Sequence, residues 1–316
     1  MTQVVCLGIL VADVVGKPIE AFPAKGTLAQ VERMELHVGG CAANTAAGLA
    51  RLGLSVAIIG RIGEDGFGRY MRQELESGGV DTRGLAQGPQ AATSATMVAV
   101  DACGERTFLH YPGANAVFTP EDIDWTLIES APILHVAGPF LMPDFIGEPC
   151  AQVLRRARAM GKTTTLDTVW DFTGRWMSAL APCLPHLDYI LPSYAEAVAL
   201  TGETDPPRIA QALLDAGAGA VGLKLGEDGA YVRSQDGFEA AIPAFKVTAV
   251  DALGAGDAWS AGFLAGIAQG WDLSRCIRLA NAVGACAVQA LGATTGVRSL
   301  AETVALMDGG EGGRRP

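Results

Sequence analysis

The sequence lacks an excess of positive charge and lacks cysteines spaced for a shared site. Its 316 residues carry a formal net charge of −11, whereas nucleic acids and anionic membranes are bound through clustered Lys and Arg. We therefore expect neither as a partner. The cysteines are odd in number, widely spread and form no CxxC pair, which argues against a disulfide framework and against a zinc site (Cys6, Cys41, Cys103, Cys150, Cys183, Cys276, Cys286).

Two further absences limit the architecture. No Pro- or Ser-rich linker interrupts the chain, so its length favours one large α/β domain with an appendage over two linked domains. The apolar run at residues 4–15 has no basic segment before it, is interrupted by Asp13 and is typical of a buried strand. No targeting or transmembrane segment is visible, and we expect a cytoplasmic protein with reduced thiols.

The chain is organised around the stretch VDALGAGDAW at residues 250–259. Residues 245–250 before the turn are strand-like, and residues 258–269 after it are helix-like. Small residues let the backbone turn sharply and approach a ligand, and the first amides of a helix have no internal acceptors. Such a corner attracts anions, and its candidate residues are Gly254, Ala255 and Gly256.

Two carboxylates, Asp251 and Asp257, flank this corner. Asp257 places a proton acceptor next to amides that stabilise an oxyanion, and this combination suits phosphoryl transfer. No Lys-Ser or Lys-Thr follows the glycines, so the corner is not a P-loop and backbone amides would hold the phosphate. The alternative is that Asp257 only caps the helix.

The two glycine motifs carry a family resemblance. DALGAGD and its small-residue helix resemble the C-terminal signature of ribokinase-like (PfkB-type) carbohydrate kinases, and GGCAAN at residues 39–44 resembles their N-terminal signature. The similarity extends from the first strand to about Gly296. It implies an α/β fold with a doubly wound, mostly parallel sheet flanked by helices and a small β-strand lid. Strand and helix patterns that alternate after residue 133 independently indicate such a sheet.

The domain organisation follows from this resemblance. We expect one kinase domain at residues 1–308, with lid segments at about 14–38 and 92–112, and a Gly-rich disordered tail at 309–316. The lid has too little sequence to form a core of its own, so one of its faces must be covered. We therefore expect a homodimer through the lid.

The resemblance also implies a sugar site. In the family, an aspartate at the position of Asp13 accepts hydrogen bonds from two neighbouring sugar hydroxyls, and the glycine motif with its asparagine completes the site (Gly39, Gly40 and Asn44). Read without the resemblance, Asp13 is a turn residue at a strand end, and Asn44 is a local cap after a glycine turn.

A nucleotide site is implied by three later segments. PSYAE takes the place of the family's NxxE motif, and the usual Asn is Ser193 here, so one nucleotide or metal contact is in question because a hydroxyl has fewer bonding groups than an amide. The turn KLGEDG supports the nucleotide, and a helical Asn contacts adenine or ribose. The residues concerned are Ser193, Glu196, Lys224, Gly226, Gly229 and Asn281. The competing interpretations are a helix-dipole Glu, a simple hairpin turn and an Asn that solvates a helix face.

ATP and Mg²⁺ are the implied cofactors, with Glu196 organising the metal mainly through water. The resemblance further implies a potassium site made by Asp251 and backbone carbonyls, and Gly296 stands where ribokinases often offer a side-chain oxygen. The remaining candidates for this site are Leu253, Ala287, Ala290 and Gly292.

We interpret the chain as an ATP-dependent phosphotransferase acting on a primary hydroxyl of a small sugar-like molecule, with Asp257 as base and the Gly254–Gly256 amides as anion hole. A nucleoside kinase of the same fold is an alternative. A dehydrogenase is disfavoured because no GxGxxG follows the first strand. A non-catalytic sugar-binding regulator stays open because of Ser193. The segment DTVWD departs from the DxNxR pattern of several sugar-acid and fructose kinases, and the sugar itself is not readable from Thr96, Phe108, His110, Phe140 and Trp170.

Overall fold

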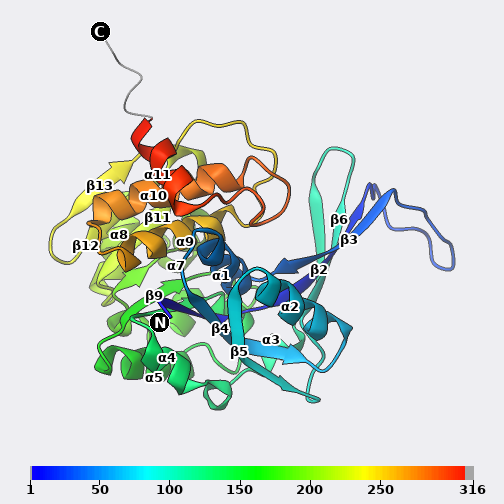
Figure 1. Ribbon diagram of the computed structural model, residues 1–316, viewed down its shortest axis with the longest axis horizontal. Helices are drawn as coiled ribbons and strands as arrows, with labels where there is room; N and C mark the ends of the chain where they lie inside the picture. The colour runs from blue at the N-terminus through cyan, green and yellow to red at the C-terminus, as the bar shows by residue number, and fades with distance from the viewer. Residues whose placement is uncertain (1, 310–316) are drawn as a thin grey trace, which may run out of the picture.

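The main domain is built on a nine-stranded sheet in the order β13-β12-β11-β10-β9-β8-β1-β4-β5 (Figure 1). The computed structural model describes residues 2–309. The strands from β5 to β11 pair in parallel and the last two pairings are antiparallel, so the expected mostly parallel sheet is confirmed. The strand bounds are β1 Val4–Gly8, β4 Val56–Gly63, β5 Val80–Gly88, β8 Ile133–Ala137, β9 Thr163–Asp167, β10 Tyr189–Ile190, β11 Ala220–Lys224, β12 Ala230–Ser234 and β13 Glu239–Ile242.

Helices cover both faces of this sheet and bury two large apolar cores. One core includes α4 Trp125–Ser130, α5 Glu148–Ala159, α6 Trp176–Leu180, α7 Tyr194–Thr201 and α8 Pro206–Asp215. The other includes α1 Cys41–Arg51, α2 Gly66–Ser77, α9 Ala255–Ala268, α10 Leu273–Ala287 and α11 Leu300–Gly309. Short turns of helix complete the domain: α3 Gly113–Ala116, η1 Pro120–Asp122, η2 Pro139–Leu141, η3 Leu184–His186 and η4 Gly226–Asp228.

The described helices are too short or too polar to span a membrane, and the last of them ends where the described residues end. Within residues 2–309, no helix is long and apolar enough to cross a membrane. The tail expected at residues 309–316 lies outside the described residues, apart from Gly309, which is the last residue of α11.

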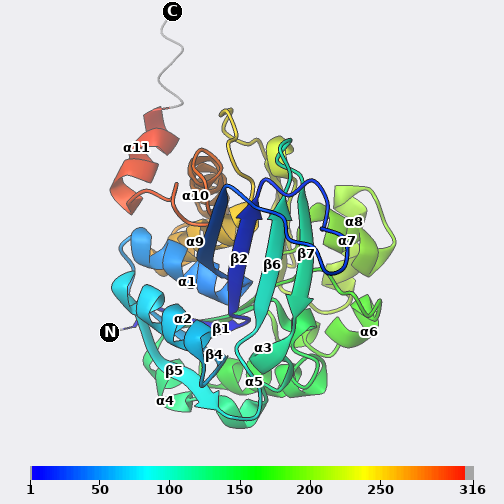
Figure 2. The same cartoon turned by 90° about the vertical axis from the view of Figure 1, so that its right-hand side faces the viewer.

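A second sheet of four strands forms the lid, in the order β3-β2-β6-β7. Its strands are β2 Val11–Lys17, β3 Arg33–Gly39, β6 Ala95–Val100 and β7 Arg106–Tyr111, and Figure 2 shows them side by side across one side of the molecule. The central pair, β2 and β6, is parallel, and each outer pair is antiparallel. The expected hairpin at residues 93–111 is therefore present.

The N-terminal apolar run is not one buried strand, which corrects the sequence-based expectation. The chain bends after β1 at Gly8, whose φ is +153°, and a Cβ there would lie 2.0 Å from the carbonyl oxygen of Ala137. Only glycine fits this close approach. The second half of the run becomes β2, so Asp13 lies within a lid strand rather than in a turn after the first strand.

The strand expected at residues 245–250 is also absent, and these residues are irregular. Two of their apolar side chains are not buried against the sheet: Val247 is 37% exposed and Val250 is 59% exposed. The backbone is held instead by the end of α10, because the amides of Val250 and Asp251 both donate to the carbonyl of Val288. Helix α9 starts at Ala255, three residues before the expected start.

Glycines let α9 pack tightly against the helix that follows it. A Cβ on Gly262 would lie 2.8 Å from the Cα of Ala280, and one on Gly266 would lie 2.8 Å from the Sγ of Cys276. Larger residues would push the helices apart. This close packing fixes the N-terminus of α9, where the candidate site lies.

Candidate active site

The two glycine motifs meet through Asn44 and Asp257. The Nδ2 of Asn44 donates to the Oδ2 of Asp257 at 2.8 Å, across 213 residues of sequence. Asn44 is in the first turn of α1, which begins after Gly40. Gly40 has φ +92°, and a Cβ there would lie 2.5 Å from the carbonyl oxygen of Ile9. The glycine therefore lets the start of α1 approach the hinge between β1 and β2.

The expected anion-binding corner is the N-terminus of α9. Gly254 is the N-cap residue in the left-handed conformation, with φ 68°, and a Cβ on it would lie 2.4 Å from the Cβ of Ala293. Gly256 is exposed, and the amide of Ala255 makes a long bond of 3.3 Å to the carbonyl of Ala252. The first amides of a helix have no intrahelical acceptors, and Ala255 and Gly256 line a cavity.

Asp257 is the third residue of α9, and the N-cap is Gly254. Asp257 is therefore not the N-cap residue of this helix. Its carboxylate is half-buried and receives the Asn44 amide. Burial, together with the nearby negative charge of Asp167, raises its pKa to about 7, while the Asn44 hydrogen bond and Lys224 oppose this shift. A base with a pKa near neutrality is well suited to take a proton from a hydroxyl.

A buried ion pair beside the corner was missed by sequence reasoning. The Nζ of Lys224 lies 2.7 Å from both carboxylate oxygens of Asp167, and the hydroxyl of Ser260 donates to one of them at 2.7 Å. A Cβ on Gly256 would lie 3.4 Å from the Lys224 ammonium. Burial alone would lower the pKa of Lys224, but Asp167 and Glu196 raise it above its usual value. The ammonium stays charged next to the corner.

One feature of the sequence could have indicated this ion pair. Asp167 and Lys224 are the last residues of β9 and β11, and parallel strands present their carboxyl ends at one edge of the sheet, where ligands bind. The sequence did not show that only β10 separates these strands.

Ser193 and Glu196 form a capping box at the start of α7. The Oε2 of Glu196 accepts from the amide of Ser193 at 3.0 Å and from the hydroxyl of Thr168 at 2.8 Å. Glu196 is half-buried, so it is more than an exposed residue favoured by the helix dipole. The serine that departs from the family's NxxE motif thus has a local role as a helix cap.

A cavity of about 740 Å³ lies on the far side of the corner, within the range of about 300–1,000 Å³ that is usual for small-molecule sites. It brings together six of the sequence-predicted residues: Lys224, Gly226, Gly229, Ala255, Gly256 and Asn281. Ser193 and Glu196 are not in its lining.

Asn281 has all of its amide groups engaged within the protein. Its Oδ1 accepts from the Nε1 of Trp259 at 2.8 Å, and its Nδ2 donates to the carbonyls of Ile242 and Pro243 at 3.0 Å. It lies in the middle of α10 and 4% of its surface is exposed. Asn281 therefore connects α9 and α10 at the cavity to the end of β13. Its contact with adenine or ribose stays a prediction.

On the lid, Asp13 and Gly39 fit each other closely. A Cβ on Gly39 would lie 2.0 Å from the Oδ2 of Asp13, so only glycine leaves room for the carboxylate. Burial raises the pKa of Asp13 to about 6, against the opposing effects of a hydrogen bond from Thr96 and the charge of His37. Asp13, Thr96 and His110 lie opposite one another across three strands, and the Thr96 hydroxyl pairs with the Nδ1 of His110 at 3.0 Å.

The candidate potassium loop is already occupied by donors. One carboxylate oxygen of Asp251 accepts from Arg106 at 2.6 Å and from the amide of Leu253 at 2.8 Å, and the other accepts from the amide of Gly292 at 2.9 Å. Burial would raise the pKa of Asp251, but these amides and the guanidinium together hold it below its usual value.

One backbone carbonyl of the expected potassium site is also engaged within the protein. The carbonyl of Ala287 accepts from the amide of Ala290 at 3.4 Å, and a Cβ on Gly296 would lie 2.7 Å from the same carbonyl oxygen. Among residues 2–309, no cluster of three or more His, Cys, Asp or Glu side chains is arranged to hold a metal ion. The role of potassium stays a prediction.

The chain is similar to known kinases over most of its length. The chain is 30% identical over 287 residues to 2-dehydro-3-deoxygluconokinase of Bacillus subtilis, with 86% of the chain and 87% of that protein covered. It is 33% identical over 268 residues to ATP-dependent ribose-1-phosphate kinase of Halopiger xanaduensis, covering 84% and 86%. Among solved structures, fructokinase with bound ATP from Xylella fastidiosa superposes with a TM-score of 0.84 at 26% identity, covering 98% and 99%.

The family model described as pfkB family carbohydrate kinase matches residues 1–300. That match spans the lid, both glycine motifs and the cavity beside α9. The chain therefore belongs to the pfkB family of carbohydrate kinases and is a sugar kinase of that family.

Proposed function

We propose that the protein transfers the γ-phosphoryl group of ATP to a primary hydroxyl of a small sugar-like substrate. The observation that carries this proposal is the position of Asp257. Its carboxylate has a pKa of about 7, is held by Asn44 from the GGCAAN motif and stands in the first turn of α9, whose N-terminus borders the 740 Å³ cavity. A proton acceptor thus lies between a sugar motif and a nucleotide-sized space.

In this reaction Asp257 takes the proton from the attacking hydroxyl. The amides of Gly254, Ala255 and Gly256 stabilise the negative charge on the transferring group, and the helix N-terminus reinforces them. The Lys224 ammonium lies next to Gly256 and adds a positive charge at the same place. On the acceptor side, Asp13 and Asn44 orient the substrate through its hydroxyls.

Magnesium supplies charge neutralisation of the nucleotide phosphates when bound. Mg²⁺ is usually held by one or two carboxylates together with substrate phosphates rather than by a protein cage. The half-buried Glu196 is the carboxylate that fits this description, and its neighbour Ser193 keeps it in place through the capping box.

A nucleoside-like substrate is the second candidate. The solved structure of aminoimidazole riboside kinase from Salmonella enterica, in complex with aminoimidazole riboside and an ATP analogue, superposes with a TM-score of 0.78 at 27% identity, covering 97% and 100%. A screen of ATP consumption over hexoses, pentoses, keto-sugar acids, phosphorylated pentoses and ribosides separates the candidates. Absence of turnover with every acceptor would contradict the proposed activity.

We also propose that the protein is a homodimer through the outer face of the lid. Met34, Met97, Leu109 and Tyr111 share one face by strand register and are 42–62% exposed. A contiguous apolar face of this kind marks a protein contact. A symmetric contact between the same faces of two copies would bury the apolar face of both lids.

A further inference from the structure

The tip of the lid reaches the loop that leads into the anion-binding corner. Arg106 is the first residue of β7, and its Nη2 lies 2.6 Å from the Oδ1 of Asp251, 145 residues away in the sequence. The side chain of Asp251 is 4% exposed and that of Arg106 is 27% exposed. This is a largely buried ion pair between the lid and the main domain.

Asp251 ties two loops together. It accepts from Leu253 on its own loop and from Gly292 on the loop that follows α10. The two loops also touch where Gly254 packs against Ala293, because no Cβ fits between them. The position of the Asp251 carboxylate therefore determines where the anion-binding corner lies relative to the loop that follows α10.

A buried carboxylate of this kind needs a positive partner. Two amides alone leave its charge incompletely compensated, and removing one member of a buried pair is strongly unfavourable. Among the described residues that contact Asp251, Arg106 supplies the only positive charge. The guanidinium therefore binds the carboxylate that the family resemblance assigned to a monovalent cation.

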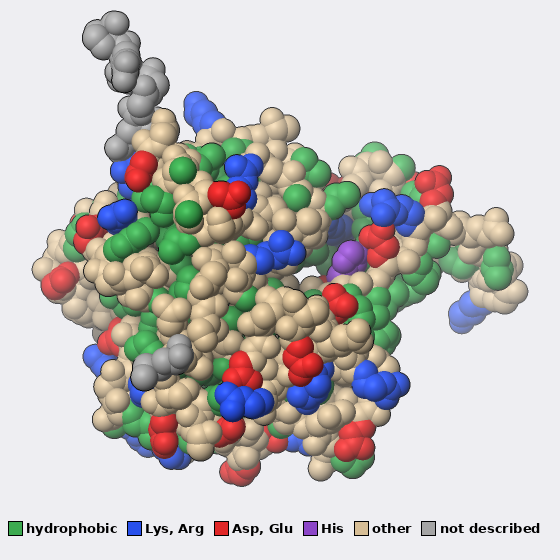
Figure 3. Space-filling view, in the orientation of Figure 1, with side chains coloured by type: hydrophobic (Ala, Val, Ile, Leu, Met, Phe, Trp, Pro, Cys, Tyr) green, Lys and Arg blue, Asp and Glu red, His purple; other side chains and the backbone are tan. Residues whose placement is uncertain are grey.

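Lid position and corner position are linked by this contact. A cavity of about 610 Å³ lies between the lid tip and both loops, and its lining includes Asp101, Arg106, Asp251 and residues 291–295. The hollow between the lid and the main body is visible in Figure 3. With the lid raised, Arg106 would leave Asp251 and expose this hollow to water.

We propose that Arg106 is a positioning residue that couples closure of the lid to the formation of the anion hole, in place of a monovalent cation. The proposal rests on the proposed kinase function. Asp13 on β2 and Thr96 on β6 belong to the same sheet as Arg106, so a sugar that draws the lid down also brings the guanidinium to Asp251. The corner is then held in place while the lid is down.

The test compares Arg106→Ala and Arg106→Lys with wild type. In Arg106→Ala we expect kcat to fall by about 10²-fold, the scale of a misplaced catalytic group, while binding of ATP is retained. Guanidinium ion or potassium should restore part of the loss and raise the melting temperature of this variant. Arg106→Lys keeps the charge without the planar fork and should be intermediate. Wild-type turnover should be equal in potassium, sodium and tetramethylammonium at the same ionic strength.

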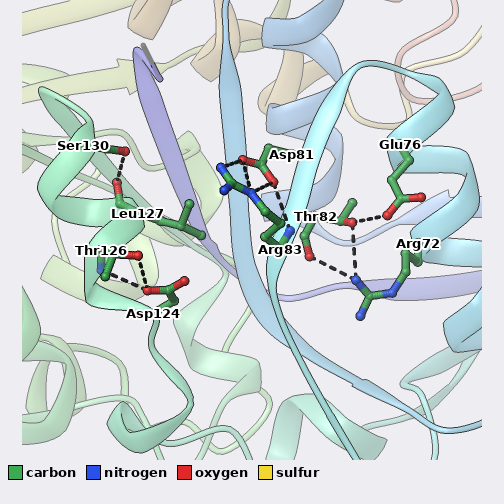
Figure 4. Close-up of polar contacts among 9 residues, drawn as sticks. All are labelled: Arg72, Glu76, Asp81, Thr82, Arg83, Asp124, Thr126, Leu127 and Ser130. Carbon is green, nitrogen blue, oxygen red and sulfur yellow. Dashed lines mark hydrogen bonds and ion pairs between the residues drawn. The ribbon is translucent and has the colours of Figure 1, made fainter.

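Arg83→Ala is the matched control. Arg83 pairs with Asp81 through Nη2 and Oδ2 at 2.6 Å, the same distance as the lid pair, but its side chain is 77% exposed, and both lie on β5 outside the site (Figure 4). This variant should keep wild-type kinetics and show no response to guanidinium.

Hydrogen exchange provides a readout that does not depend on turnover. The amides of Leu253 and Gly292 donate to Asp251, so both should exchange faster in Arg106→Ala and normally in Arg83→Ala. Unchanged exchange at both amides, or a wild-type enzyme that potassium activates over tetramethylammonium, would overturn the proposal. If wild type phosphorylates no acceptor, the kinase proposal fails, and the exchange result still decides the role of Arg106.

Discussion

Asp251 and Asp257 stand six residues apart, and their surroundings push their pKa values in opposite directions. At Asp251, burial is outweighed by two amides and the Arg106 guanidinium, so its pKa lies below the usual value. At Asp257, burial acts together with the negative charge of Asp167, and the pKa rises to about 7. Diverging pKa values of this kind separate a structural carboxylate from a proton acceptor.

Replacing Asp257 tests that assignment directly. Asp257→Asn keeps the size of the side chain but removes the proton acceptor, so turnover should fall by about 10²-fold or more, with the fold intact and acceptor affinity close to wild type. Steady-state kinetics and acceptor titration by calorimetry measure both. Asp124→Asn is the control, because Asp124 caps α4 through Thr126, away from the site (Figure 4). Near-normal turnover in Asp257→Asn would exclude the proposed mechanism.

The raised pKa of Asp257 predicts the dependence of turnover on pH. The base acts when it is deprotonated, so kcat should increase as the pH rises through about 7 and then level off. In Asp257→Asn the residual rate should lose this step. A wild-type profile that is flat between pH 5.5 and 8.5, roughly the window around that pKa, would contradict the value.

The same shift predicts how stability depends on pH. The folded pKa of about 7 lies above the unfolded value of 3.8, so the folded state holds a proton more tightly than the unfolded state does. The contribution of Asp257 to the free energy of unfolding is therefore full below the unfolded pKa and decreases until the pH passes the folded pKa. We expect Asp257→Asn to gain melting temperature relative to wild type at pH 8 and to gain less at pH 5.

Among the elements, the alternation of strand and helix was predictable because buried parallel strands are short apolar runs between amphipathic helices. Residues 245–250 have the same composition and form no strand, because the end of this segment is bonded to the end of α10 instead, a long-range contact that the local sequence does not encode. The contacts of Lys224 with Asp167 and of Arg106 with Asp251 were unpredictable for a related reason. They join elements 57 and 145 residues apart, and their proximity depends on strand order.

The turn into α9 provides a prediction about backbone geometry. Gly254→Ala places a side chain at φ 68° and 2.4 Å from the Cβ of Ala293. We expect a loss of about 1–3 kcal/mol in the free energy of unfolding from the strained backbone, a further loss from the contact, and reduced turnover. Denaturant titration measures the stability.

Gly270→Ala is the comparison for this variant. Gly270 has a φ of +71°, close to that of Gly254, but nothing lies within 4 Å of a Cβ there. It isolates the backbone strain from the steric contact. Equal losses in the two variants would show that the approach of Ala293 does not constrain the corner.

At the scale of the whole molecule, the lid is the part with an uncovered face. Met97→Glu combined with Leu109→Glu puts two charges on paired positions of that face, and like charges facing a second copy oppose association. Analytical ultracentrifugation should give a dimer for wild type and a monomer for the double variant. Phe172→Glu, at a residue that is 76% exposed outside the lid, should remain a dimer. A monomeric wild type at micromolar concentration would contradict the assembly.

The order of the two proposed ligand sites along the chain affects how substrate specificity can change during evolution. In the proposed reaction, the acceptor side draws on residues 11–111, and the cavity proposed for the nucleotide draws on residues 224–288. Asn44 and Asp257 form a direct hydrogen bond between the two regions. Substitutions in the first region can therefore change what is phosphorylated while the phosphate donor stays the same. Related proteins that keep the hydrogen bond between these two regions can therefore differ in the substrate they phosphorylate through substitutions in the N-terminal third of the chain.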